Sequence, residues 1–357
     1  MSESIAGIVP VSNPIREADP SRGVEAATIT YSVSPGFVGL LARLNISVAL
    51  TSYQSGKFYL LGRNPAGGLM VHERLFQKAM GLCVAGNSLV LATLFQLMRF
   101  ENVLEKGQFI NRTYDACYVP RLIHTTGVLD AHDVGLTNDG EVIFVNTRYN
   151  CLATTSAKHS FTALWKPPFI TQIIDEDRCH LNGLAMENGC ARYVTAVSRS
   201  NTIDGWRDRR ANGGIVLDVA SGDVVCGGLS MPHSPRLAGG RLWVLNSGTG
   251  ELGHVDGQTF QPVAFCPGFV RGLAFCGDYA FVGLSKPRYS RFAGLPLDER
   301  LQAADSEPWC GIQVINISSG ACTEWFRIDG AIAEIYDVGV IAGVACPMAL
   351  GFASDDI

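Results

Sequence analysis

A short pattern recurs along the chain and limits the folds that it can adopt. Each copy has an apolar strand-like segment, a tight turn of Gly, Asn or Asp, and a second β-rich segment. The copies are 37 to 52 residues apart and begin at Met80, His132, Asn182, Ser234 and Arg271. The turn residues tolerate the positive φ angles that tight hairpins require, so each copy is a predicted β-hairpin. Further strand-like runs follow, as at 214–219 and 223–228, which gives four expected strands per repeat.

Four strands in a period of ~40–50 residues are typical of a β-propeller blade. Five blades start at the repeats, and a sixth is predicted to be split between the chain ends. Residues 47–52, 57–61 and 69–74 offer three outer strands. No inner strand precedes them, because residues 35–44 have a helical pattern with its core at 37–44. Residues 336–340 supply the missing inner strand. We therefore predict an all-β, six-bladed propeller of four-stranded blades, with the ring closed by pairing of N- and C-terminal segments.

The whole chain is therefore predicted to consist of a flexible leader over residues 1–34 and a single propeller domain over residues 35–357. Two long loops, 198–212 and 286–309, each follow the second strand of a blade. Structureless loops of this length in a compact fold usually serve a function or form a lid.

Composition excludes several classes of protein. The net charge is −5 and no Lys/Arg-rich block occurs, which argues against nucleic acid as a partner. The longest apolar stretch, 338–353, is interrupted by glycine and proline, so no membrane span is expected. The 11 cysteines form no CxxC pair and are expected to be buried, reduced thiols. The N-terminus lacks a signal-peptide pattern, and a cytoplasmic location is therefore predicted.

Three runs carry a resemblance to known proteins: LDAHDV at 129–134, HLNGL at 180–184 and PHSPR at 232–236. Over roughly residues 35 to 350 the chain resembles an uncharacterised bacterial family of conserved hypothetical six-bladed β-propeller proteins. It is more distantly similar to propellers of the gluconolactonase, strictosidine-synthase and NHL-repeat type. This resemblance implies the fold and supplies no chemistry.

Three of the seven histidines, His132, His180 and His233, fall at consecutive blade starts. First strands line the central channel of a propeller, so these side chains are expected to converge. Three neutral imidazoles can bind one divalent transition metal, zinc or iron, and leave a position open for water or substrate. Peptidyl-α-hydroxyglycine lyase, also a six-bladed propeller, is similar in using one His from each of three blades for zinc. The alternative is that each imidazole bonds to a backbone carbonyl and holds the ring together.

Other polar residues are predicted at the same channel mouth. Arg271, Arg148 and Tyr336 are candidates for orienting an anionic substrate and moving a proton, because guanidinium groups bind carboxylate or phosphate through two hydrogen bonds. Tyr336 could instead simply fill the ring. The candidate substrate-binding residues are Asn182, Asn146, Asn246, Arg199 and Lys286. Arg199 could equally belong to a solvated loop face.

Three acids leave a choice open. Asp130 or Asp133 could fix a tautomer of His132, or Asp133 could bridge neighbouring blades. Asp337 presents the same alternatives.

These observations predict a metal-dependent lyase, hydrolase or isomerase that acts on a small, anionic metabolite. The rival interpretation is a non-catalytic propeller that binds a protein or a small ligand. The metal content of the purified protein distinguishes the two. The oligomeric state is not predicted.

Overall fold

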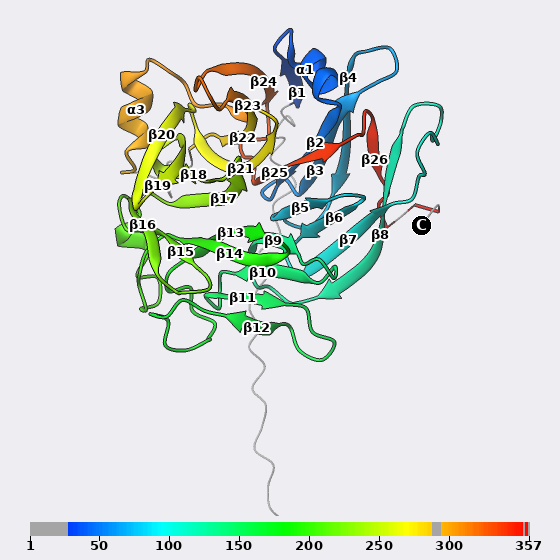
Figure 1. Cartoon of the computed structure of the whole chain (residues 1–357). Coiled ribbons are helices and arrows are strands. Elements are labelled where there is room, and N and C mark those ends of the chain that lie inside the picture. Colours follow the sequence, from blue (N-terminus) through cyan, green and yellow to red (C-terminus); the bar gives the residue numbers. More distant parts are fainter. Residues whose placement is uncertain (1–27, 288–293, 353, 356–357) are drawn as a thin grey trace, which may run out of the picture.

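The computed structural model describes residues 28–287, 294–352 and 354–355. Six antiparallel sheets surround a common centre, and the chain colours follow the ring in order (Figure 1). The predicted six-bladed propeller is thus confirmed. The first three blades contain β5(Leu82–Ala85), β6(Ser88–Ala92), β7(Gln96–Asn102), β8(Ala116–Thr125); β9(Ala131–Leu136), β10(Val142–Asn146), β11(Cys151–Thr154), β12(Thr162–Trp165); and β13(Leu181–Glu187), β14(Cys190–Ala196), β15(Gly214–Asp218), β16(Val224–Leu229). The fourth and fifth contain β17(Pro232–Ala238), β18(Arg241–Asn246), β19(Glu251–Asp256), β20(Thr259–Phe265); and β21(Phe269–Cys276), β22(Tyr279–Ser285), β23(Cys310–Asn316), β24(Cys322–Asp329).

The sixth blade joins the two ends of the chain, as predicted. Its inner strand is β25(Asp337–Ala342), which pairs with β2(Ile46–Ser52), followed by β3(Lys57–Arg63) and β4(Leu69–Leu75). Two further strands lie on other blades. β1(Thr30–Val33) pairs with β24 on the fifth blade, and β26(Pro347–Ala349) runs parallel to β8 on the first. Both cover outer edges that would otherwise expose unpaired backbone groups.

β1 lies inside the segment that was expected to be a leader, so the ordered part of the domain begins before residue 35. Residues 1–27 of that segment are outside the described residues. α1(Phe37–Leu44) matches the predicted helix. The long loop at 286–309 contains α3(Leu297–Ala303), which the sequence did not indicate, and its residues 288–293 are not described.

The hydrophobic core is divided into clusters that lie between neighbouring blades. β2 shows how one strand serves two of them. Val48 and Leu50 pack toward the fifth blade, whereas Ala49 packs toward the first. Successive side chains of a strand point to opposite faces, so a strand that is buried along its whole length, as β2 is, can fill both spaces. The blades are therefore held together face to face by apolar packing.

Polar side chains on the inner strands of alternate blades bridge to the inner strand of the next blade. Asp133 accepts the backbone N–H of Leu184 in the next blade (2.9 Å), and Asp337 accepts that of Leu82 (2.8 Å). Ser234 likewise accepts the N–H of Gly272 (3.0 Å). The structure thus assigns Asp133 and Asp337 to the bridging alternative. The blades between them carry glycine at the corresponding position, namely Gly81, Gly183 and Gly272.

Arg236 lies at the centre of this ring of bridges. Its guanidinium contacts both carboxylate oxygens of Asp133 (2.8 and 3.3 Å) and lies 3.5 Å from Asp337. It also donates to the carbonyls of Leu184 (2.8 Å) and Leu273 (3.2 Å). One cation therefore connects inner strands of five blades. Burial and the Asp133 charge raise the pKa of Asp337 to about 7, because both favour the neutral carboxyl.

The expectations drawn from composition can also be compared with the structure. The 11 cysteines all lie in described segments as free thiols, most of them buried, although Cys190 and Cys322 are exposed. Within the described residues, no helix has the length and hydrophobicity that a membrane span requires.

The close approach of the inner strands gives a first testable prediction. Gly272 has φ +75°, and a Cβ there would lie 2.5 Å from the backbone nitrogen of Val338 in the next blade. Gly240, in a hairpin turn, has a similar φ of +72° but open space around its Cβ position. Both alanine variants suffer the φ strain, but only Gly272→Ala forces two blades apart.

We expect Gly272→Ala to lower the free energy of unfolding by about 1–3 kcal/mol more than Gly240→Ala, as measured by chemical denaturation. Equal losses for the two variants would show that the inner strands tolerate separation.

Candidate functional site

The starts of the first strands form two tiers of side chains around one channel mouth. The outer tier includes four residues with left-handed φ angles between +48° and +55°, namely Lys78, Asp130, His180 and Met231. Two positions further along each strand comes the inner tier, formed by Met80, His132, Asn182, His233, Arg271 and Tyr336. This left-handed backbone recurs in four blades, two residues before the inner-tier position, and is absent at the corresponding residues 269 and 334 of the other two.

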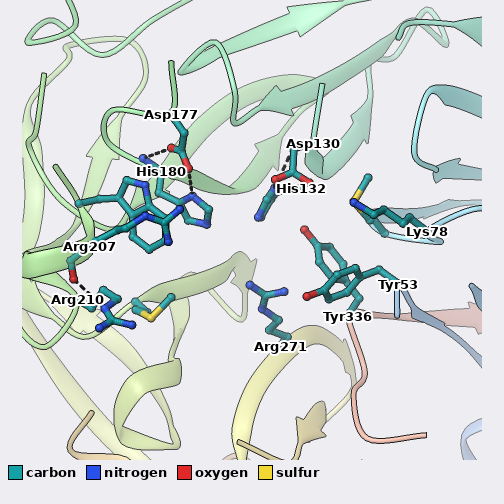
Figure 2. A pocket seen from close by; sticks show the side chains of 13 residues that line it. Tyr53, Lys78, Asp130, His132, Asp177, His180, Arg207, Arg210, Arg271 and Tyr336 are labelled. Atoms are coloured by element: carbon teal, nitrogen blue, oxygen red, sulfur yellow. Dashed lines mark hydrogen bonds and ion pairs between the residues drawn. The ribbon is translucent and has the colours of Figure 1, made fainter. Parts of the chain in front are cut away.

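A cavity of about 230 Å³ occupies this mouth (Figure 2). Its size is at the small end for ligand sites, which suits a small metabolite. The lining combines both tiers with the loop after β14. The lining residues are Tyr53, Lys78, Met80, Asp130, His132, Asp177, His180, Trp206, Arg207, Arg210, Met231, Arg271 and Tyr336.

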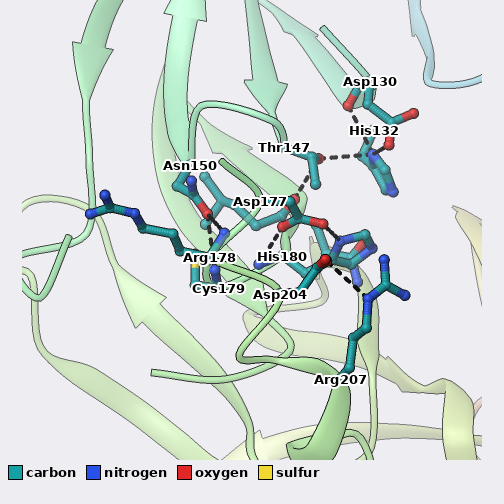
Figure 3. Close-up of polar contacts among 12 residues, drawn as sticks. Asp130, His132, Thr147, Asn150, Asp177, Arg178, Cys179, His180, Asp204 and Arg207 are labelled. Carbon is teal, nitrogen blue, oxygen red and sulfur yellow. Dashed lines mark hydrogen bonds and ion pairs between the residues drawn. The ribbon is translucent and has the colours of Figure 1, made fainter. Parts of the chain in front are cut away.

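His132 is held in one tautomer by a chain of hydrogen bonds (Figure 3). Its Nδ1 lies 2.9 Å from the carbonyl oxygen of Asp130 and 2.8 Å from the Thr147 hydroxyl. That hydroxyl donates its own proton to the carbonyl of Leu181 in the next blade (2.7 Å). Both groups beside Nδ1 therefore accept, so Nδ1 carries the proton and Nε2 keeps its lone pair. Burial lowers the pKa of His132 to about 4, and the ring is neutral near pH 7.

His233 repeats this arrangement two blades further on. Its Nδ1 lies 2.8 Å from the Met231 carbonyl and 2.8 Å from the Ser247 hydroxyl, which donates to the carbonyl of Val270 (2.6 Å). Its Nε2 is buried without a hydrogen-bond partner among the described residues. Burial, with a smaller effect of the Arg271 charge, lowers its pKa well below the ordinary value. His233 is not among the residues that line the cavity.

His180 belongs to the outer tier and is paired with an acid. Asp177 accepts from Nδ1 of His180 (2.6 Å) and from its backbone N–H (3.0 Å), which again leaves Nε2 with a lone pair (Figure 3). The imidazole stacks on Trp206, with ring centroids 4.1 Å apart. Trp206 comes from the loop 198–212, so that loop does form part of the site. The side-chain carbonyl oxygen of Asn150 accepts the backbone N–H groups of residues 178 and 179, and it thereby holds the backbone just before His180 in place.

The three predicted histidines do not share one set of contacts. His132 and His180 meet in the cavity with ring centroids 5.0 Å apart. His233 is equivalent to His132 in its strand, whereas His180 lies one tier above. In the described part of the chain, no group of three or more His, Cys, Asp or Glu side chains is arranged to hold a metal ion. The binding of zinc or iron by these residues stays a prediction, and the reaction proposed for this site does not require a metal ion.

Arg271 and Tyr336 reach the cavity as predicted (Figure 2). The Cζ atom of Arg271 lies 4.8 Å from the Tyr336 ring centroid and 5.5 Å from that of Phe269. Burial raises the pKa of Tyr336 well above 10, so its hydroxyl remains protonated. Five buried polar atoms around the channel mouth lack partners in the described structure, and three of them, on Arg271, Tyr336 and Trp206, belong to residues that line the cavity. The five atoms are Arg271 Nε, Tyr336 Oη, His233 Nε2, Asn182 Oδ1 and Trp206 Nε1. Such atoms are rare in folded proteins and mark a place for water or ligand.

Other predicted site residues lie elsewhere. The exposed Arg148 pairs with Asp175 (2.7 Å), and the exposed Arg199 lies over the Phe169 ring. Neither these two arginines nor Lys286 line the cavity. Asn146 and Asn246 are buried and accept backbone N–H groups of residues 149 and 230, so they hold turns. Among the predicted asparagines, Asn182 alone keeps an unpartnered oxygen on the inner tier.

Several lining residues were not recognised as site residues from the sequence. Lys78 lies two positions before a predicted blade start, as His180 does, and this offset was the available signal. Asp177 could have been found from its position three residues before His180, which is close enough for its carboxylate to reach the imidazole. Arg207 and Arg210 were not among the predicted site residues, but both line the cavity together with Trp206 of the same loop.

The balance of charges around the cavity favours an anion. Four cationic residues line it, against two acids. The cations are Lys78, Arg207, Arg210 and Arg271, and the acids are Asp130 and Asp177. Asp177 is already engaged by His180.

Comparison with known proteins supports the architecture. A chain of a nidogen/laminin complex superposes with a TM-score of 0.52 at 9% identity, covering 84% of this chain and 99% of that one. Virginiamycin B lyase from Staphylococcus aureus gives a TM-score of 0.38 at 10% identity, with 84% and 99% coverage. Regucalcin from Agrobacterium tumefaciens gives 0.38 at 14% identity, with 81% and 90% coverage. At 9% identity the likeness to the first of these concerns the fold alone, and nothing is inferred from the other two.

No curated protein matches the sequence. The family model described as a domain of unknown function, DUF4915, matches residues 35–350, which span nearly all of the propeller. The expected kinship with an uncharacterised propeller family is thereby confirmed, and the chain belongs to the DUF4915 family.

Proposed function

We propose that the channel mouth is an active site for proton transfer on a small anionic metabolite, in a lyase or isomerase reaction. The observation that carries this proposal is the meeting of His132, His180, Arg271 and Tyr336 in one cavity. Two imidazoles with free lone pairs, a guanidinium and a protonated phenol form a set that can bind an anion and exchange protons with it.

Each residue has a distinct role in this proposal. Arg271 binds the carboxylate or phosphate of the substrate, aided by the positive rim. His180 is the general base, because Asp177 orients the ring and stabilises the charge that develops when Nε2 takes a proton. Tyr336 donates a proton to the oxygen on which negative charge develops. His132 has too low a pKa to be an effective base near pH 7, and it accepts a hydrogen bond from the substrate instead.

The anion site is tested by ligand-induced thermal shifts. A panel of small carboxylates and phosphate monoesters should raise the melting temperature of the wild type. Arg271→Gln should abolish the shift, because the inner-tier guanidinium is lost. Arg148→Gln should keep it, because that arginine lies outside the cavity and pairs with Asp175. Loss of the shift in Arg148→Gln instead would place the anion on the outer face.

Proton transfer is tested in D2O with the acids that bind. NMR should show exchange of the C–H next to the anionic group, and Asp177→Asn should slow it by roughly 100-fold or more. Asp175→Asn, which removes a nearby exposed acid, should leave the rate unchanged. If the bound acids exchange no proton and remain unaltered, the site is a binding site without catalysis, which is the rival function.

The same samples answer the question of the metal. Zinc or iron near one equivalent that is lost in both His132→Ala and His180→Ala would replace this mechanism with a metal-assisted one.

The role of His132 requires a neutral ring, and this requirement gives a pH prediction. The unfolded chain takes up a proton at His132 below pH 6.5, whereas the buried native ring resists protonation until about pH 4. Native stability that is present above pH 6.5 is therefore lost as the pH falls towards 4, by on the order of 3 kcal/mol for this group.

His132→Gln should show a smaller fall of melting temperature between pH 6.5 and 4 than the wild type. His159→Gln, a change at an exposed histidine, should show the full fall. Identical slopes for His132→Gln and wild type would mean that the native ring titrates normally.

A further inference from the structure

The inner tier divides into two chemically different halves. Blades two to four contribute His132, Asn182 and His233, whereas blades five and six contribute Arg271 and Tyr336. The first group offers hydrogen-bond acceptors and the second offers donors. In the first group the division follows from the hydrogen bonds that the side chains already make, and in the second it follows from the chemistry of the guanidinium and the phenol.

The acceptor half is fixed by its supporting contacts. In both His132 and His233, Nδ1 faces two acceptors, so Nε2 presents a lone pair. Asn182 donates through Nδ2 to the carbonyl of Pro232 (3.2 Å), which leaves its Oδ1 without a partner in the described structure. These three acceptors come from neighbouring blades on one side of the channel.

The donor half lies opposite. A guanidinium can only donate, and Arg271 has a buried Nε without a partner among the described residues. The Tyr336 hydroxyl is equally buried, unpartnered and protonated. Contacts connect the two halves. The His132 and Tyr336 rings are 5.7 Å apart, and Phe269 lies between Arg271 (5.5 Å) and His233 (5.6 Å).

Resting on the function proposed above, we infer that the substrate is an anion that also carries a hydroxyl group. The anionic oxygens lie against Arg271 and Tyr336, and the hydroxyl donates across the channel to the acceptor half. An anion alone offers no donor to these acceptors, of which His132 lines the cavity while Asn182 and His233 lie on the inner tier of the next two blades, and a buried acceptor without a donor costs about as much as a lost hydrogen bond. A hydroxyl fits better than an ammonium group, since the acceptors are uncharged and Arg271 is adjacent.

Matched sets of probes test this inference. The carboxylate set is succinate, malate and aspartate, and the phosphate set is ethyl phosphate, 2-hydroxyethyl phosphate and phosphoethanolamine. Within each set only the donor group changes, from none to hydroxyl to ammonium. Calorimetric titration of the wild type should show the hydroxylated member binding at least about 10-fold more tightly than the member without a donor in one of the sets.

Variants of the acceptor half should remove this preference. His233→Leu and Asn182→Ala should each bring the two affinities within about 2-fold by weakening only the hydroxylated ligand. His254→Leu is the matched control. His254 lies on β19 of the same blade as His233 and also has a buried ring nitrogen without a described partner, but it is outside the channel. If His233→Leu does not fold, as judged by circular dichroism, Asn182→Ala carries the test.

The outcomes separate the inference from the function on which it rests. Equal affinities within both sets, with loss of binding in Arg271→Gln, would overturn the hydroxyl inference and keep the anion site. Tightest binding of the ammonium member would overturn it in favour of a zwitterionic ligand. No binding of any probe, or binding that Arg271→Gln leaves intact, would overturn the proposed function as well.

Discussion

The ion cluster of Arg236, Asp133 and Asp337 is the interaction on which the geometry of the ring depends. Apolar packing joins each pair of neighbouring blades, but it has little directionality and acts only between neighbours. The cluster connects blades that do not touch and fixes how closely their inner strands approach. Removing one partner would leave a buried charge unpaired, and such losses are among the most destabilising single changes. The polar core is therefore what sets the diameter of the channel and, with it, the spacing of the side chains above.

Two imidazoles of the inner tier are held directly by this frame. His132 and His233 are held through Thr147 and Ser247 to carbonyls of the following blades. The hydrogen bonds that orient the two imidazoles therefore also help to hold the propeller together. A site of this kind is preorganised before any ligand arrives.

The sequence was most informative where periodicity carries the signal. Hairpin turns, alternating apolar residues and the split blade follow from local chemistry, so the fold could be predicted down to the position of α1. The site could be predicted only in part. Arg271, Tyr336 and His132 were found because they stand at blade starts. His180 lies in the outer tier because it stands two residues before the inner-tier position of its strand, where the backbone is left-handed, as it is at Asp130. No local sequence pattern predicts this backbone conformation.

Loops were the least predictable part. Trp206 approaches His180 because of how residues 198–212 fold back over the mouth, a tertiary effect that spacing does not encode. Arg148 and Arg199 were expected at the mouth for the opposite reason. They follow second strands in sequence, but local ionic and aromatic partners draw them to the exterior.

The position of Arg236 limits how a ligand can pass through the channel. Its salt-bridged side chain lies across the axis below the inner tier, so the channel is closed at its base. Whatever enters from the histidine side has to leave by the same opening. A ligand would therefore enter and leave through the single mouth that Trp206 helps to line, and a second molecule could enter only after the first had left.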